Sequence, residues 1–115
     1  MIVLLMLIAA MLQAPGNAAT QPAGNAENGR KLFTDNTCYY CHGTVGQGGA
    51  AGARVALVAR NAQSFIRYVR RPTGAMPAYT EKVLSDQQLT DIYAYLRSLP
   101  PAKAVKDIPL LTQMK

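Results

Sequence analysis

The spacing of apolar residues along the chain predicts three main helices and no strand. In the first, at residues 26–35, Leu32 and Phe33 follow Gly29 by three and four positions and so share one helical face. Asn25 stands where a helix N-cap is expected. A glycine inside a helix costs about 1 kcal/mol relative to alanine, so Gly29 indicates the close approach of another helix.

The second predicted helix spans residues 62–70 and is amphipathic. Its apolar face consists of Ala62, Phe65, Ile66 and Val69. Asn61 can cap its start, and Pro72 ends it because the residue before a proline is kept out of the helical region. The chain after this proline, residues 73–79, is predicted to be extended or turned, with a short helical turn over 80–83.

The third predicted helix has the clearest pattern. Ser85 and Gln88 form an S-x-x-Q capping box at its start, and Pro100 with Pro101 ends it. Its apolar residues, at helical spacing, are Leu89, Ile92, Tyr93, Leu96 and Leu99. Residues 100–115 are expected to form a loosely attached tail. The sequence thus predicts one small all-α domain.

Glycines are concentrated between the first two predicted helices. Residues 43–52 hold Gly43, Gly46, Gly48, Gly49 and Gly52, which are five of the nine in the chain. The segment has no apolar period and is therefore predicted to be a loop. It does not fit a phosphate-binding loop, because it lacks the G-K-S/T sequence and no predicted strand precedes it.

The first 19 residues have the composition of a cleaved signal peptide. An apolar run of about 12 residues is followed by small residues up to Ala19, although no Lys or Arg precedes the run. The alternative is an uncleaved membrane anchor, but a spanning helix needs about 20 apolar residues. We therefore expect export to the periplasm, a flexible leader at 20–25, a domain at 26–99, and no transmembrane anchor after cleavage.

Basic residues outnumber acidic residues by 12 to 6, which gives a formal net charge of +6. The first charged residue is Glu27, so all of this charge belongs to the predicted mature domain. This excess of basic residues favours redox partners with acidic docking surfaces. The alternative is that the basic residues only keep the surface soluble. No nucleic-acid motif is present. Arg67, Arg70 and Arg71 at the end of the second helix either stabilise that helix terminus or serve docking.

The chemistry of the chain is concentrated at Cys38-Tyr39-Tyr40-Cys41-His42. This stretch contains both cysteines and the only histidine, and C-x-x-C-H is the signature of covalent c-type haem attachment. Cys38 and Cys41 would form the two thioethers, and His42 would be an axial iron ligand. A thioredoxin-like pair, a structural disulfide or half a zinc site are the alternatives. A zinc site lacks a second ligand pair, and a thioredoxin-like pair lacks its βαβ context.

A second axial ligand can come from a methionine. With one histidine in the chain, bis-His ligation is excluded, which leaves Met, Lys, Asn or an open position. Met76 lies in a predicted loop between Gly74 and Pro77, whereas Met114 is next to the C-terminus, where fraying is common. A lone methionine often only fills a core, but together with C-x-x-C-H we interpret Met76 as the ligand. Two filled axial positions favour electron transfer over oxygen or peroxide chemistry.

These residues resemble the class I monohaem c-type cytochromes, which are small soluble bacterial proteins with His/Met ligation. The resemblance covers about residues 26–99. It rests on Gly29-x-x-Leu32-Phe33, Cys38-x-x-Cys41-His42-Gly43, Met76-Pro77 and Ile92-x-x-Tyr95-Leu96. It implies the cytochrome c fold around one covalently bound haem c, with the first and last helices crossing at right angles. Gly29 and Phe33 should then meet Tyr95 and its neighbours.

The resemblance also implies a hydrogen-bond partner for His42. The family commonly has a proline in the loop after the glycines, and its carbonyl accepts the Nδ1 hydrogen of the ligating histidine. Ala53 occupies that place here. Its carbonyl can serve in the same way, although the loop should be less rigid. The neighbouring Arg54 would reach a haem propionate or remain in solvent.

The sequence as a whole predicts an exported electron carrier, not an enzyme. Tyr39, Tyr40 and the glycine loop would border an exposed haem edge through which electrons pass. One alternative is a cytochrome subunit of a dehydrogenase complex that accepts electrons from a flavin, quinone or molybdenum partner. Another is a haem-free C-x-x-C thiol oxidoreductase. The expected partners are a dehydrogenase, a terminal oxidase or reductase of a respiratory chain, or both.

Overall fold

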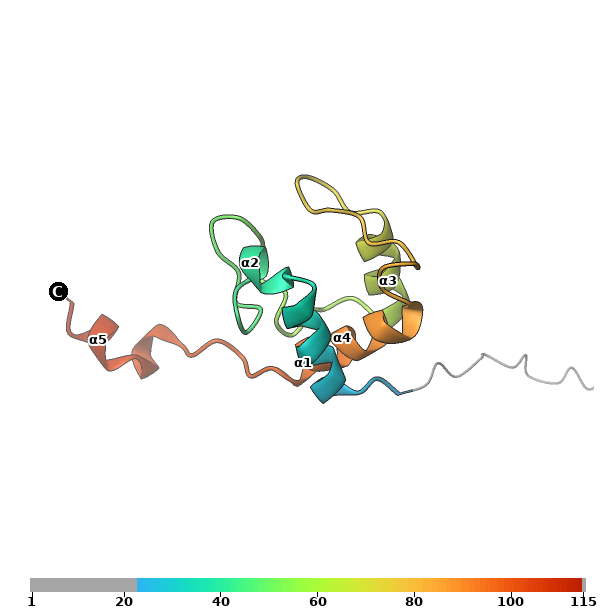
Figure 1. Cartoon of the computed structure of the whole chain (residues 1–115). Coiled ribbons are helices and arrows are strands. Elements are labelled where there is room, and N and C mark those ends of the chain that lie inside the picture. Colours follow the sequence, from blue (N-terminus) through green and yellow to red (C-terminus); the bar gives the residue numbers. More distant parts are fainter. Residues whose placement is uncertain (1–22, 115) are drawn as a thin grey trace, which may run out of the picture.

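The computed structural model describes residues 23–114, and this part of the chain is helical (Figure 1). Its elements are α1 (Ala26–Asp35), α2 (Cys38–His42), α3 (Ala62–Arg70), α4 (Asp86–Ser98), the 3₁₀ turn η1 (Val105–Asp107) and α5 (Pro109–Thr112). Between residues 23 and 114 the β-type pairing is limited to an isolated bridge between Gly49 and Gly52. The all-α prediction is confirmed. The signal peptide expected at residues 1–19 lies outside the described residues.

The three predicted helices are α1, α3 and α4, and their caps are those expected. Asn25 accepts a hydrogen bond from the backbone N–H of Asn28, and Asn61 accepts one from that of Ser64. Ser85 and Gln88 form the reciprocal capping box at the start of α4. The apolar spacing and the capping residues thus predicted the starts of all three helices correctly.

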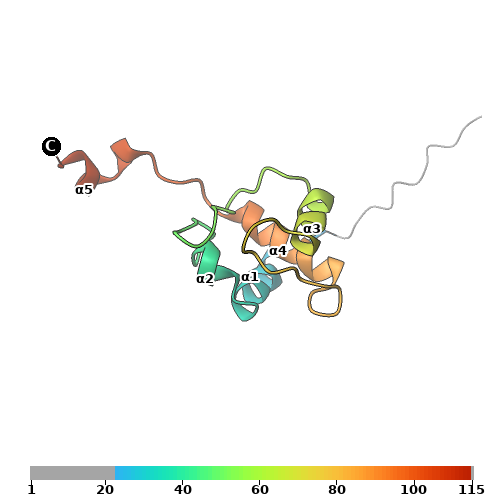
Figure 2. The ribbon, with the colours of Figure 1, turned by 90° about the horizontal axis from the view of Figure 1, so that it is seen from above.

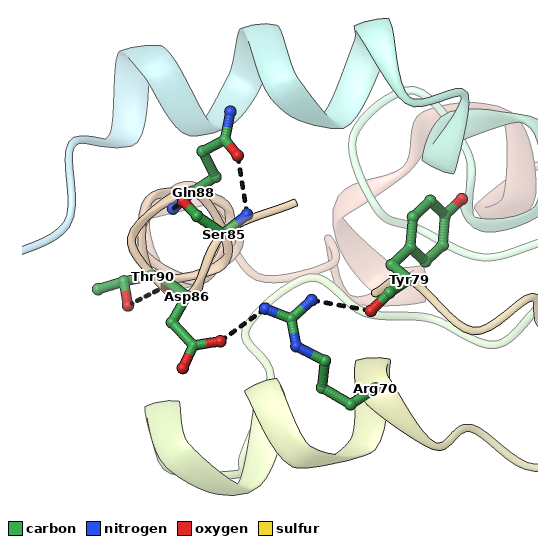
Figure 3. Close-up of polar contacts among 6 residues, drawn as sticks. All are labelled: Arg70, Tyr79, Ser85, Asp86, Gln88 and Thr90. Carbon is green, nitrogen blue, oxygen red and sulfur yellow. Dashed lines mark hydrogen bonds and ion pairs between the residues drawn. The ribbon is translucent and has the colours of Figure 1, made fainter. Parts of the chain in front are cut away.

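Helices α1 and α4 cross in close contact, as the resemblance implied. Figure 3 shows α4 nearly along its axis while α1 runs across the view. A Cβ atom added to Gly29 would lie only 1.9 Å from the carbonyl oxygen of Asp91, so no larger residue fits at this crossing. One turn farther along, the rings of Phe33 and Tyr95 pack with their centroids 5.6 Å apart. Gly29 itself meets Asp91 and Ile92.

A buried carboxylate holds the start of α1 against α4. Asp91 is 5% exposed and accepts hydrogen bonds from the backbone N–H of Asn25 at 2.8 Å, from Asn28 Nδ2 at 2.7 Å and from Gln87 Nε2 at 3.1 Å. Burial alone would raise the pKa of Asp91, but these three donors outweigh it, and the net pKa is lowered. Asn25, assigned to the flexible leader from the sequence, is therefore fixed to the domain.

The core lies where α1, α3 and α4 meet. Its buried members are Phe33, Phe65, Ile66, Val69, Leu84, Leu89, Ile92, Tyr95 and Leu96. Leu84 is 1% exposed although it belongs to no helix, and the periodic pattern did not identify it. It follows a turn in which the N–H groups of Val83 and Leu84 both donate to the carbonyl of Thr80. The turn expected at 80–83 is thus present and inserts a core side chain.

The C-terminal segment extends away from the domain in both views (Figures 1 and 2). Its elements η1 and α5 pack on each other and not on α1 to α4. Val105, Leu110 and Met114 on this segment are largely exposed. Within the described part of the chain, no helix has the length and apolar character needed to cross a membrane.

Candidate haem-binding site

The C-x-x-C-H stretch forms its own short helix, α2, which the sequence pattern did not predict. Thr37 precedes it with a left-handed backbone (φ 57°), and its carbonyl accepts the N–H of Tyr40 at 3.0 Å. Gly43 ends it at φ 79°. Because residues three and four apart share a helical face, this turn presents Cys38, Cys41 and His42 to one side.

An apolar cavity lies beside this face and is shared by three parts of the chain. Cys38 and His42 come from α2, Met76 from the loop after α3, and the remaining walls from the core. The other lining residues are Phe33, Val55, Phe65, Val69, Tyr79, Leu84, Leu89, Ile92 and Leu96. The empty volume is about 390 Å³, including open space at the mouth.

His42 is oriented by the segment that the sequence indicated. Its Nδ1 lies 2.7 Å from the carbonyl oxygen of Ala53. A carbonyl can only accept, so Nδ1 carries a hydrogen, and in the neutral ring Nε2 is the nitrogen available to a metal ion. Ala53 is held near because the loop packs tightly: a Cβ atom on Gly52 would lie 2.8 Å from the carbonyl oxygen of Cys41.

The two cysteines have different surroundings. Cys38 lines the cavity, and burial, only partly offset by hydrogen bonds, raises the pKa of its thiol. Cys41 is partly buried against the glycine loop and is not among the residues lining the cavity. The structure therefore brings Cys38, His42 and Met76 to one cavity, with Cys41 beside it. Met114 is on the projecting tail, 76% exposed.

Tyr79 joins the two sides of the site and was not identified from the sequence. Its hydroxyl donates to the carbonyl of Asn36, just before α2, at 3.3 Å, and its N–H donates to the carbonyl of Val69 at 3.2 Å. Its ring also lines the cavity. Burial is the main cause, and the nearby Cys38 the next, of a raised pKa for the Tyr79 hydroxyl. Its position three residues after Met76 was the one available signal.

The lining of the cavity suits an apolar group held by a few specific side chains. Among residues 23–114, no fully buried side-chain nitrogen or oxygen lacks a hydrogen-bond partner. Nor does this part of the chain contain a cluster of three or more His, Cys, Asp or Glu side chains placed to hold a metal ion. A zinc site therefore lacks its ligands, whereas a haem fits the donor set.

Comparison with known proteins identifies the family. Residues 24–96 match the family described as cytochrome c oxidase, cbb3-type, subunit III, which covers more than half of the chain. The chain belongs to this family of c-type cytochromes. Membership implies binding of haem and transfer of electrons, and the matched range contains the whole C-x-x-C-H stretch, the Met76 loop and most of α4.

Two curated proteins are similar to this cytochrome. A thiosulfate dehydrogenase of Psychrobacter arcticus is 35% identical, over 72% of this chain and 29% of its own length. A cytochrome c oxidase subunit 2 of Alkalihalophilus pseudofirmus is 30% identical, over 64% of this chain and 25% of its own length. The cytochrome thus spans less than a third of either relative. No solved structure matches it significantly.

Proposed function

We propose that this cytochrome transfers single electrons in the periplasm through one covalently bound haem c. Cys38 and Cys41 would hold the haem as thioethers, and His42 and Met76 would be the axial ligands. The supporting observation is the convergence of Cys38, His42 and Met76 on one apolar cavity. Met76 lies 34 positions after His42 in the chain, so local sequence alone does not bring them together.

Each proposed residue has a physical role that the surrounding structure supports. The haem would supply an iron that changes oxidation state by one electron. The Ala53 carbonyl fixes the tautomer of His42 and raises the basicity of the ring. A thioether sulfur such as that of Met76 stabilises ferrous iron and raises the reduction potential. The apolar walls exclude water, and two filled axial positions would leave no place for a substrate.

The proposed route for electrons passes the α2 side of the site. Tyr39 is 38% exposed and Tyr40 80% exposed on this helix, and Val45 in the glycine loop is 52% exposed. Three exposed apolar side chains beside the cavity-lining residues offer a contact surface for a redox partner. The basic balance of the chain supports partners with acidic docking surfaces.

A second candidate is a cytochrome module of a larger redox enzyme. The two relatives bear the names of a dehydrogenase and an oxidase subunit, and each is more than three times as long as the region that they share with this chain. A module of this kind would take electrons from a catalytic partner and need the same haem site. Stoichiometric co-purification with a dehydrogenase or oxidase from native membranes or periplasm would favour it over a free carrier.

A haem-free thiol oxidoreductase is the less favoured alternative. Such enzymes need a cysteine whose pKa is depressed, so that the thiolate attacks. Burial instead raises the pKa of Cys38. A thiol of this kind is a poor nucleophile at neutral pH.

The proposal is tested by spectroscopy of the protein matured with haem. We expect sharp c-type bands on reduction and haem that resists acid–acetone extraction, because thioether bonds survive that treatment. Met76→Ala should lower the reduction potential and open the iron to added ligands, whereas Met114→Ala should do neither. Extractable haem would contradict the attachment, and an unchanged potential in Met76→Ala would contradict the axial assignment.

A further inference from the structure

The loop that carries Met76 begins and ends at two oppositely charged residues. Arg70 is the last residue of α3 and Asp86 is the first residue of α4, so residues 71–85 form the connection between them. Met76 lies near the middle of this connection. Figure 3 shows the Arg70 side chain lying between the two helices, with Asp86 on one side and Tyr79 on the other.

One guanidinium group contacts both the end and the interior of this loop. Arg70 Nη2 donates to Asp86 Oδ1 at 2.6 Å, and Arg70 Nη1 donates to the carbonyl oxygen of Tyr79 at 2.8 Å. The Arg70 side chain is 19% exposed, against 51% for Asp86. An exposed ion pair alone contributes little. Here the planar fork of the arginine also fixes a backbone carbonyl three residues after Met76.

Both partners of Arg70 are themselves held in place. Asp86 lies inside the capping box, between Ser85 and Gln88, and its carbonyl accepts a hydrogen bond from Thr90 Oγ1 at 2.8 Å (Figure 3). Tyr79 is fixed by the contacts that it makes with Val69 and with Asn36, just before α2. Arg70 therefore ties both Tyr79 and Asp86 to the end of α3. The segment from Arg70 to Tyr79, which contains Met76, is thus closed at both ends by the contact between Arg70 and the Tyr79 carbonyl.

We propose that Arg70 is a positioning residue for Met76, because it holds the loop closed over the cavity. The inference rests on the proposed role of Met76 as an axial ligand. An added ligand such as imidazole can reach the iron only when the loop opens, so its apparent affinity is proportional to the fraction of open molecules. Loosening the loop raises that fraction. The weaker sulfur ligation also lowers the reduction potential.

The test is titration of the ferric holoprotein with imidazole, together with measurement of its reduction potential. Arg70→Gln removes both contacts, and we expect imidazole to bind about tenfold more tightly, which is about 1.4 kcal/mol. Asp86→Asn removes the ionic contact but leaves the carbonyl contact, so a smaller increase, about threefold, is expected. Arg67→Gln is the matched control. It lies one turn earlier on α3, changes the charge equally, and its side chain donates to Ser64 Oγ and does not contact the Met76 loop.

The outcomes separate positioning from simple stabilisation. Unchanged imidazole affinity and potential in folded Arg70→Gln overturns the proposal, even if its thermal stability falls. An equal change in Arg67→Gln also overturns it, since charge alone would then explain the effect. If Arg70→Gln does not mature, Arg70→Lys and Asp86→Asn replace it, because each retains part of the contact set. Normal imidazole affinity in Met76→Ala would instead refute the proposed axial ligand.

Discussion

Asp91 shows how one buried side chain determines the junction between the two ends of the domain. Its carboxylate accepts three hydrogen bonds and has a lowered pKa. A carboxyl whose pKa is lower in the folded state contributes stability above its unfolded pKa, near 3.9. That contribution is lost as the pH falls through the folded pKa. Asp91 therefore supports the fold at neutral pH and makes it sensitive to acid.

We expect Asp91→Asn to lower the free energy of unfolding by about 2 kcal/mol at pH 7, because an amide nitrogen would face groups that donate. The loss should shrink as the pH falls from about 4 towards the lower folded pKa, because the carboxyl of the unfolded wild-type chain is protonated first. Urea unfolding of the holoprotein at several pH values measures both effects. Asp35→Asn, which changes an exposed acid on α1, should alter stability by less than about 0.5 kcal/mol. If the free energy of unfolding changed with pH in the same way for wild type and Asp91→Asn, this account would be contradicted.

Gly29 is a second residue whose role is decided by one contact. Alanine should improve helix propensity by about 1 kcal/mol, but its methyl group would lie within 2 Å of the Asp91 carbonyl oxygen. We expect a net destabilisation of about 2 kcal/mol, since the two helices must move apart. Thermal unfolding measures it. Gly49→Ala is the control, because an added Cβ there has a nearest neighbour at 3.9 Å. Equal stability of the two variants would show that the crossing tolerates a side chain.

The residues that the sequence identified differ in kind from those it missed. Gly29, His42 and Met76 are unusual for their type or spacing, and a pattern can indicate them. Arg70 was expected either to stabilise the end of its helix or to dock a partner. Its side chain instead contacts residues 9 and 16 positions farther along the chain. Tyr79 likewise acts through a contact across 43 residues. Contacts of this range depend on tertiary packing, which no local period encodes.

Among the elements, the three long helices could be predicted because each has an apolar face and a capping residue. The short helix α2 could not. Five residues make little more than one turn, too few for a period to appear. Its start also depends on the left-handed backbone of Thr37, and threonine gives no sign of that conformation. The element that contains the chemistry of the site was thus the least visible in the pattern.

The loop between α2 and α3 is an element without regular structure that nevertheless orients His42. The substitution Ala53→Pro tests whether this loop is less rigid with alanine than with proline at position 53. We expect the variant to be up to about 1 kcal/mol more stable, because proline restricts the unfolded chain. The carbonyl at position 53, and with it the bond to His42, is retained. Thermal unfolding and the reduction potential measure the two effects. Lower stability or a changed potential would show that proline does not fit the backbone at position 53.

The whole molecule carries an excess of positive charge, and this should govern how quickly it exchanges electrons. With a net charge of +6, we expect the rate with hexacyanoferrate, an anion, to fall about tenfold between 0.01 and 0.1 M salt. The rate with hexaammineruthenium, a cation, should rise over the same range. Stopped-flow kinetics measures both. A flat dependence with both reagents would show that the charge is too dispersed to steer a partner.

The crossing of α1 with α4 also has a consequence for the order of folding. The contact joins Asn25 to Asp91, which are 66 positions apart, so it is made only after nearly the whole domain is available. Closing so long a loop is slow compared with forming local helices. Until α4 docks, the cavity lacks one of its walls, and the side chains of α2 remain accessible from outside. The proposed attachment of a haem to Cys38 and Cys41 would therefore have an interval before the last helix docks.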